Sequence, residues 1–313
     1  MTITATAQLR RERTATPLTV LMCRPTHFTV SYSINPWMQP ENPTDTARAL
    51  SQWDELRRVF VRLGFTIQEV EPGEGLPDMV FAANGGLVVD GKAYTARFTH
   101  AERAPESGLY ADWFRRAGLD VIDAEEVNEG EGDVLLIGDT LFAGTGFRTD
   151  TSSHEEMART FGREVVSLRL VRADFYHLDT ALAVLDATPG QEHIAYLPSA
   201  FDEASRAELE RRFPDAILVD EHDAQAFGLN AVSDGLHVIT AARATAFQHQ
   251  LREAGYEPIG VDLTELLLAG GGAKCCTLVL RDRPASPVAG DAEATTASSL
   301  PHSPASSTPK EAR

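Results

Sequence analysis

The chain has 313 residues, 43% of them hydrophobic, and carries 28 Lys and Arg against 46 Asp and Glu, a net charge of −18. A chain of this length can bury a large core in one large domain or two. The negative surface argues against binding to nucleic acid or anionic membranes and is compatible with a cationic small-molecule partner.

Three cysteines are too few for a disulfide framework, and the odd number favours a reducing compartment. The sequence has no long apolar run, so no membrane-spanning helix is predicted. The N-terminal residues include Arg10, Arg11 and Arg13 but no apolar stretch, which is unlike a secretory signal. A cytoplasmic enzyme fits these features best.

Both ends of the chain differ in composition from the rest. Residues 284–313 are rich in Ala, Ser, Thr and Pro, and few large apolar residues occur there. Such segments bury too little apolar surface to offset the entropy cost of ordering. We therefore expect a single domain over residues 17–283, with disordered segments at residues 1–16 and 284–313.

The first predicted elements are a strand and a helix. Residues 18–23 are typical of a short buried strand. Residues 44–63 predict a helix, because apolar side chains recur there at helical spacing. Thr44 or Asp45 can cap its start, and Gly64 can end it.

From residue 86 onward one unit recurs, made of a β-hairpin, an amphipathic segment and, in most copies, a short returning strand. The hairpins begin at residues 86, 133, 181, 230 and 276, which gives spacings of 47, 48, 49 and 46 residues. The fifth copy has one strand, which the strand at residues 18–22 can complete. The even spacing favours a closed ring of five units over a generic α/β fold.

The stretch from Gly270 to Leu280 contains a candidate nucleophile. Three glycines lead into Lys274, Cys275 and Cys276, and an apolar run follows. Glycine permits close backbone approach to a ligand, and a nearby cation lowers the pKa of a thiol. Cys275 is therefore a candidate nucleophile. The alternative is a Gly-rich turn followed by buried cysteines with a purely structural role. A catalytic cysteine also needs a His partner elsewhere in the chain.

Three other segments occupy the same phase of the repeat as Cys275. One contains His177 and Asp179, which strand alternation would point to the same face. His is suited to proton transfer near neutral pH. The other two contain Glu129, in an acidic glycine-rich turn, and Asn84. Each segment alone is also typical of an ordinary polar loop or strand edge, but a ring would gather them around one cavity suited to a guanidinium.

Together these motifs resemble the guanidine-modifying enzyme superfamily, the pentein fold, over about residues 18–282. The stretch His177-Leu178-Asp179-Thr180 is similar to the His-x-Asp of arginine deiminases, and residues 271–277 are similar to their Gly-Gly-x-x-Cys turn. Residues 34–38 and 77–86 look closest to arginine dihydrolases and to actinobacterial proteins labelled as dimethylargininases. The resemblance implies an α/β fold, specifically a five-bladed pseudo-symmetric propeller of ββαβ repeats.

The resemblance also implies roles for individual residues. Cys275, favoured by position over Cys276, would be the nucleophile, and His177 would be the general acid and base. Asp179 and Glu129 would hold the guanidinium nitrogens, with Glu131 as the alternative to Glu129.

Three further residues would bind the rest of the substrate. Arg97 and Arg148 would bind its α-carboxylate, and Asn35 would help to orient it. Asn84 stands where deiminases and many dimethylargininases carry Asp; the dihydrolase branch has Asn there, which leaves room for a neutral ureido group. Asp179 departs from a typical dimethylargininase, in which Lys often follows His-Leu.

The implied activity is hydrolysis of the guanidino C–N bond of arginine or N-methylated arginine through a covalent thiouronium on cysteine, with no metal and no organic cofactor. The products would be ammonia or an amine and citrulline, which a dihydrolase converts further to ornithine. The alternatives are an amidinotransferase and a non-catalytic arginine-binding protein. A zinc site at Cys275 and Cys276 is disfavoured, because adjacent cysteines cannot easily share a tetrahedral ion. The sequence fixes neither the preferred substrate nor the oligomeric state, and it is compatible with a homo-oligomer.

Overall fold

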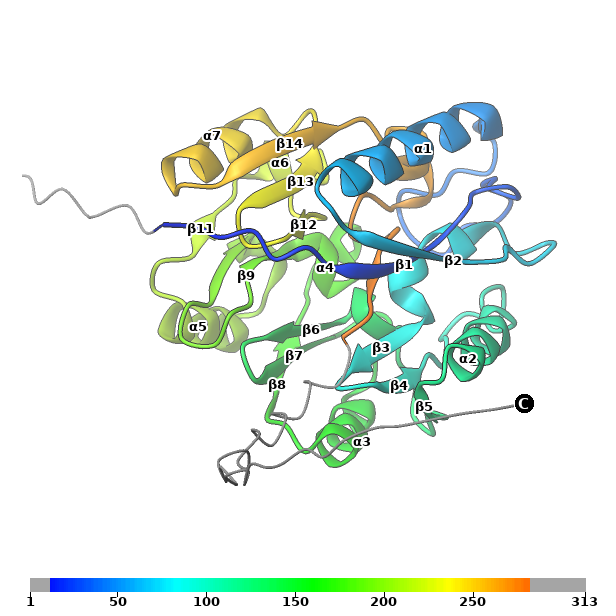
Figure 1. The fold of residues 1–313 in the computed structure, drawn as a ribbon, viewed down its shortest axis with the longest axis horizontal. Helices are drawn as coiled ribbons and strands as arrows, with labels where there is room; N and C mark the ends of the chain where they lie inside the picture. Colours follow the sequence, from blue (N-terminus) through cyan, green and yellow to red (C-terminus); the bar gives the residue numbers. More distant parts are fainter. Residues whose placement is uncertain (1–11, 282–313) are drawn as a thin grey trace, which may run out of the picture. The chain divides into compact units, whose positions relative to one another are not determined.

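The computed structural model describes residues 12–281, which form five three-stranded β-sheets and the helices that connect their strands (Figure 1). The strands, grouped by sheet, are β1 (Thr19–Cys23), β2 (Thr66–Val70) and β15 (Leu278–Val279); β3 (Gly86–Val89), β4 (Lys92–Thr95) and β5 (Asp120–Ile122); β6 (Val134–Ile137), β7 (Thr140–Thr145) and β8 (Val165–Arg169); β9 (Leu182–Asp186), β10 (His193–Tyr196) and β11 (Ile217–Leu218); β12 (Val232–Ser233), β13 (His237–Ala241) and β14 (Glu257–Val261).

All five sheets have the same connectivity. The central strand pairs antiparallel with one neighbour and parallel with the other. Four of the antiparallel pairs are the predicted hairpins. The fifth joins β1 to β15, with Val20 opposite Val279. The prediction that the N-terminal strand completes the last hairpin is therefore confirmed.

A helix connects the two parallel strands of every sheet. The predicted helix at residues 44–63 is observed as α1 (Thr46–Arg62), and the Asp45 side chain caps it by accepting a hydrogen bond from the backbone N–H of Arg48 at 3.0 Å. Its apolar face, which includes Trp53 and Phe60, is fully buried. The connecting helices are α1 (Thr46–Arg62), α2 (Glu106–Arg116), α3 (Thr151–Phe161), α5 (Glu203–Arg212) and α7 (Thr245–Glu253).

Short helical segments precede several of the strands that begin each hairpin. They are η1 (Pro77–Val80) and η2 (Ala82–Gly85) before β3, η3 (Gly130–Gly132) before β6, α4 (Leu178–Ala181) before β9, and η6 (Leu266–Ala269) before β15. η3 contacts both η2 and α4, and η2 contacts β15. These contacts bring the segments that carry the predicted site residues together.

The ordered domain begins before the predicted boundary at residue 17. The Arg13 guanidinium lies 4.0 Å from the ring centroid of Tyr256 and 3.5 Å from Asp186 Oδ2. The backbone N–H of Thr16 donates to the carbonyl of Asp234 at 2.7 Å. Residues 12–16 therefore belong to the folded domain, whereas the rest of the segments predicted to be disordered, residues 1–11 and 284–313, lies outside the described residues. Within residues 12–281, no helix combines the length and apolar character needed to cross a bilayer.

Candidate active site

The glycine-rich turn before β15 places the thiol of Cys275 among polar side chains. Cys275 Sγ accepts a hydrogen bond from Asn230 Nδ2 at 3.1 Å and donates to Asp179 Oδ2 at 3.4 Å. The turn needs its glycines, because Gly270 has a φ of +82° and a Cβ on Gly271 would lie 2.1 Å from the Phe81 ring. Within residues 12–281, Cys275 is the one cysteine whose thiol is hydrogen-bonded to side chains.

A buried carboxylate holds the catalytic histidine candidate. His177 Nε2 lies 2.7 Å from Glu129 Oε2, and Arg148 Nη1 donates to both oxygens of the same carboxylate at 3.1 and 2.9 Å. Burial opposes ionisation of Glu129, but Arg148 and His177 outweigh it and hold the pKa of this carboxyl below its usual range. An ionised Glu129 makes Nε2 the protonated nitrogen of neutral His177, which leaves Nδ1 as the basic one.

His177 Nδ1 and Asp179 Oδ1 are both buried without a hydrogen-bond partner among the described residues. Burial raises the pKa of Asp179 to about 7, although Lys274 acts in the opposite direction. A planar cation with several N–H groups matches an acceptor of this kind.

His177 and Asp179 do not share a strand face, so the alternation argument was wrong. His177 has an extended backbone and precedes α4, and Asp179 lies within that short helix. Their side chains consequently diverge, one toward Glu129 and the other toward Cys275.

The structure distinguishes Glu129 from Glu131. The Glu131 carboxylate accepts from Lys274 Nζ at 3.1 Å and from the backbone N–H of Val279 at 2.7 Å, and it also binds Arg281. Glu131 thus ties the nucleophile turn to β15, and Glu129 is the residue beside His177. Both Glu129 oxygens are bound to Arg148 and His177 of the protein, whereas the prediction was a direct contact with the guanidinium of the substrate.

The segment around Asn84 contacts both Glu129 and the turn that carries Cys275. Its Oδ1 accepts from Arg103 Nη1 at 2.8 Å, and its Nδ2 donates to the carbonyl of Glu129 at 3.2 Å. The neighbouring Ala83 N–H donates to the carbonyl of Cys275 at 3.0 Å. These contacts, with those of His177 and Asp179, connect Asn84, Glu129, His177, Asp179 and Cys275 into one buried network.

The residues assigned to the outer part of the substrate have protein partners in this structure. Asn35 Nδ2 donates to the carbonyl of Ala269 at 3.1 Å, which ties residues 34–38 to the turn before Cys275. Arg97 is exposed, and its Nη1 donates to the carbonyl of Glu125 at 2.6 Å. The roles of Arg97, Arg148 and Asn35 in substrate binding stay predictions.

Sequence reasoning missed three buried residues of the network. Asn230 contacts Cys275 directly. Arg103 binds Asn84 and, through two hydrogen bonds, Glu106. Asp78 Oδ2 accepts from Tyr32, and its Oδ1 is buried without a partner within residues 12–281. Position in the repeat was a usable signal for Asn230, which opens the fourth hairpin, and for Asp78, which shares a segment with Asn84.

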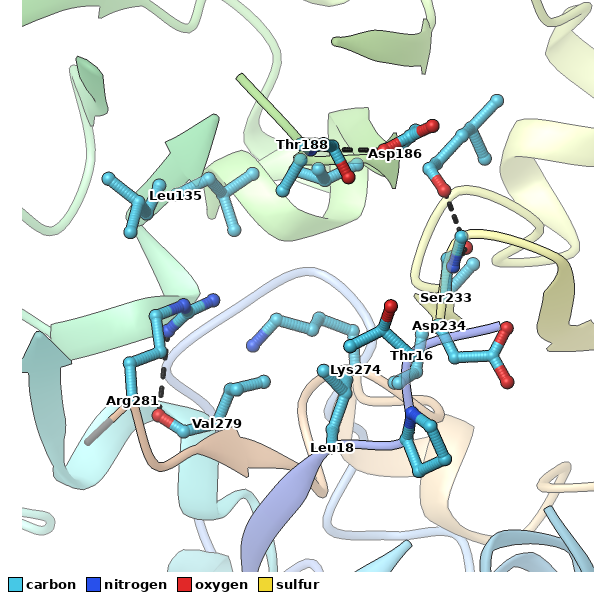
Figure 2. Close-up of a pocket in the computed structure, with 18 of the residues that line it drawn as sticks. Thr16, Leu18, Leu135, Asp186, Thr188, Ser233, Asp234, Lys274, Val279 and Arg281 are labelled. Carbon is cyan, nitrogen blue, oxygen red and sulfur yellow. Dashed lines mark hydrogen bonds between the residues drawn. The ribbon is translucent and has the colours of Figure 1, made fainter. Parts of the chain in front are cut away.

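A cavity of about 430 Å³ is lined by residues of β1, β6, β9, β12 and β15 and of the segments beside them (Figure 2). Leu135, Thr188, Ser233 and Val279 are among its lining residues. Lys274 reaches this cavity, but neither Cys275, His177 nor Asp179 lines it. This cavity therefore does not mark the candidate active site.

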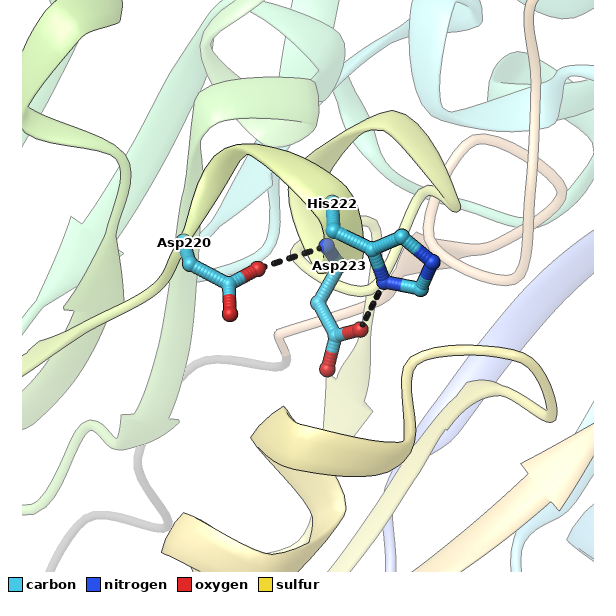
Figure 3. Close-up of side chains that lie close together, drawn as sticks. All are labelled: Asp220, His222 and Asp223. Carbon is cyan, nitrogen blue, oxygen red and sulfur yellow. Dashed lines mark hydrogen bonds and ion pairs between the residues drawn. The ribbon is translucent and has the colours of Figure 1, made fainter.

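Asp220, His222 and Asp223 lie close enough together to hold a metal ion (Figure 3). They belong to α6 (Glu221–Gln225) and its cap: Asp220 Oδ1 accepts from the backbone N–H of Asp223 at 2.8 Å. Asp223 also accepts from His222 Nδ1 at 3.0 Å and from the backbone N–H of Phe247 at 2.6 Å. These hydrogen bonds hold α6 against α7, and the cluster is part of the scaffold.

Comparison with known proteins gives consistent results. The family model for N,N dimethylarginine dimethylhydrolase, eukaryotic, matches residues 24–281. The chain is 50% identical over 276 residues to N(G),N(G)-dimethylarginine dimethylaminohydrolase of Mycobacterium tuberculosis, covering 88% of this chain and 90% of that protein. It is 38% identical to the bifunctional arginine dihydrolase/ornithine cyclodeaminase ArgZ of Synechocystis, covering 90% of this chain but 40% of that longer protein.

Solved structures agree with this relationship. The substrate-bound N-terminal domain of ArgZ, an arginine dihydrolase from cyanobacteria, superposes with a TM-score of 0.80 at 38% identity, covering 85% of this chain and 98% of that one. A dimethylarginine dimethylaminohydrolase adduct gives a TM-score of 0.68 at 22% identity, covering 85% and 100% of the two chains, which supports the shared fold. The predicted α/β class and the predicted superfamily are confirmed, and the chain belongs to the dimethylarginine dimethylaminohydrolase family.

Proposed function

We propose that Cys275, His177 and Asp179 carry out hydrolysis of the guanidino group of dimethylarginine or arginine. The hydrolysis itself follows from the family and from the 50% identical relative. The observation that carries the residue assignment is the thiol of Cys275 at 3.4 Å from Asp179 Oδ2, with unpartnered His177 Nδ1 in the same buried network of the described chain. The substrate is a small guanidino compound, and no metal or organic cofactor enters the reaction.

In the first half-reaction, the guanidinium binds against Asp179. Burial, reinforced by the charge of Asp179, raises the pKa of the Cys275 thiol well above its ordinary value, so the free site holds a neutral thiol. The cationic substrate offsets this effect and favours the thiolate. The thiol gives its proton to Nδ1 of His177, and the sulfur forms a bond to the guanidinium carbon. The C–N bond to the leaving group then breaks as His177 delivers that proton to the departing amine.

In the second half-reaction, neutral His177 accepts a proton from water. The resulting hydroxide adds to the thiouronium carbon, and the C–S bond breaks to return the thiolate. Loss of the hydroxyl proton to solvent then gives citrulline. Glu129 keeps the imidazole in one orientation and stabilises its protonated form, as expected for a carboxylate bound to the opposite ring nitrogen.

We propose dimethylarginine as the first-choice substrate, because the relative at 50% identity that matches over 90% of its own length is a dimethylarginine dimethylaminohydrolase. Arginine with a second round to ornithine is the other candidate, favoured by the uncharged Asn84 side chain at the site. Incubation with dimethylarginine, arginine, citrulline and agmatine separates the two. If dimethylarginine gives only dimethylamine and citrulline, the first choice is supported. If the enzyme forms ornithine when citrulline is the substrate, the dihydrolase is supported. Transfer of the amidino group to added glycine or lysine would indicate an amidinotransferase.

We also propose that the five sheets are blades of a closed propeller formed by residues 12–281, with the site on its central axis. The shared connectivity of the sheets and the pairing of β1 with β15 support this arrangement. The three cysteines are free, which supports a reducing compartment, and we propose the cytoplasm. A homo-oligomer is a further proposal, which light scattering tests directly.

Asp179 is expected to reduce stability as the pH rises. Its pKa is raised from 3.8 to about 7, so the folded state binds the extra proton between these values and stability falls as the pH rises through that window. Asp179→Asn removes this effect. At pH 8 we expect its Tm to exceed that of the wild type by about 2 to 4 °C, and its kcat/KM to fall sharply. Thermal unfolding from pH 4 to 8 checks this, and a Tm difference that does not change with pH would contradict it.

A further inference from the structure

We propose that Asn230 positions the Cys275 thiol and stabilises its thiolate. Asn230 is 1% exposed and lies just before β12, 45 residues away from Cys275 in the chain. Its side chain makes three hydrogen bonds, all to residues of the candidate active site. Oδ1 accepts from the backbone N–H of Cys275 at 3.0 Å, and Nδ2 donates to Cys275 Sγ and to the carbonyl of Asp179, both at 3.1 Å.

The partners determine which end of the amide faces the sulfur. The backbone N–H of Cys275 can only donate, and the carbonyl of Asp179 can only accept. Both contacts require the orientation with Oδ1 toward the backbone of Cys275 and Nδ2 toward Sγ. The sulfur thus faces a donor, and a donor to sulfur favours the charged thiolate over the neutral thiol.

The backbone around Asn230 is built for this contact. A Cβ on Gly272 would lie 2.9 Å from Asn230 Oδ1, so the last glycine of the nucleophile turn leaves room for the amide. The backbone N–H of Lys274 also donates to the carbonyl of Asn230, at 3.3 Å. On the other side, the N–H of Asn230 donates at 3.2 Å to Phe227, which has an unfavourable φ of +62°. Strain of this kind persists where surrounding structure enforces it, often at functional sites.

The donor has two effects on the proposed reaction. It holds Sγ in one place, beside Asp179, before the substrate binds. It also shares the negative charge of the thiolate once the proton has left. This inference rests on the proposed role of Cys275 as the nucleophile. It goes further because it assigns part of the stabilisation of the thiolate to the Asn230 amide, in addition to the part that the substrate cation provides.

The isosteric variant Asn230→Asp tests this idea. It keeps an acceptor for the N–H of Cys275 but replaces the donor to sulfur with a carboxylate oxygen. We expect alkylation of Cys275 by iodoacetamide at pH 8, followed by mass spectrometry, to slow by about 10- to 100-fold, because a hydrogen bond to a charged group is lost. We expect kcat for the guanidino substrate to fall by a similar factor, with KM changed by less than about threefold.

Gln52→Glu is the matched control. Gln52 is also a buried amide that accepts from a backbone N–H, that of Glu265 at 2.9 Å, but it lies outside the catalytic network. Gln52→Glu should leave the alkylation rate of Cys275 unchanged.

If Asn230→Asp does not fold, Asn230→Ala is the second test variant, because it also removes the donor to sulfur and adds no charge. Wild-type alkylation and kcat in a folded Asn230 variant, even with a lowered Tm, would overturn the proposal and leave Asn230 a purely structural residue. Alkylation needs no turnover, so this result is independent of whether the proposed hydrolysis is correct.

Discussion

Cys275→Ser is expected to reduce kcat by a factor on the order of 10⁴ or more, the scale seen when a catalytic nucleophile is removed. A hydroxyl ionises far less readily than a thiol, and the buried site near Asp179 disfavours a further negative charge. Release of citrulline and of dimethylamine or ammonia measures turnover. Mass spectrometry of the quenched wild-type enzyme should show the covalent adduct on Cys275, and the serine variant should lack it.

The adjacent cysteine supplies the control for this prediction. Cys276 is also buried, and it packs in the apolar cluster with residues such as Val279. Cys276→Ala should keep turnover within a few-fold of the wild type while lowering the Tm modestly. Wild-type turnover by Cys275→Ser, or loss of the adduct only in Cys276→Ala, would refute the assignment of Cys275.

The second large effect is expected for Glu129→Gln, which should impair activity and stability together. The glutamine removes the negative charge that Arg148 and His177 share in a buried site. Leaving a buried cation unpaired costs about 3–5 kcal/mol. Loss of the fixed imidazole and of its stabilised protonated form should lower kcat by about 10²- to 10⁴-fold. Chemical denaturation and steady-state kinetics measure the two effects separately.

The free energy of unfolding measured at acidic pH provides a further check. Because the pKa of Glu129 is depressed in the folded state, its contribution to stability is present above the ordinary carboxyl pKa and is lost only as the pH falls through the depressed value. The deficit of Glu129→Gln should therefore persist at neutral and mildly acidic pH. Glu125→Gln changes an exposed carboxyl nearby and should affect neither stability nor kcat. Equal effects of the two variants would contradict the specific role of Glu129.

Local patterns predicted most of the scaffold. The Asp90-Gly91 turn was predictable, because Asp-Gly favours the positive φ that a two-residue hairpin turn requires. In the structure these residues join β3 to β4 with φ of 54° and 74°. The spacing of apolar residues located α1, and turn chemistry located its ends. These features depend on neighbouring residues, so sequence patterns report them well.

Features set by distant residues were not predictable in this way. Asp133, just before β6, accepts from the backbone N–H of Leu178 at 3.0 Å and so holds the start of α4, which is why the segment around His177 is not a strand. The choice between Glu129 and Glu131 depends on the loop at Gly130, whose positive φ of 56° breaks any regular alternation. Asn230 has a position in the repeat that marks it as a candidate, but its contact with Cys275 joins residues 45 positions apart and no local pattern reports it.

The pairing of β1 with β15 has a consequence for the order of assembly. The nucleophile turn leads directly into the last described strand, and that strand finds its antiparallel partner at the opposite end of the described chain. A growing polypeptide therefore cannot build its reactive centre until nearly all of the domain has left the ribosome, and contacts so far apart in sequence form slowly. The thiol is thus placed among its polar neighbours only when the last sheet closes.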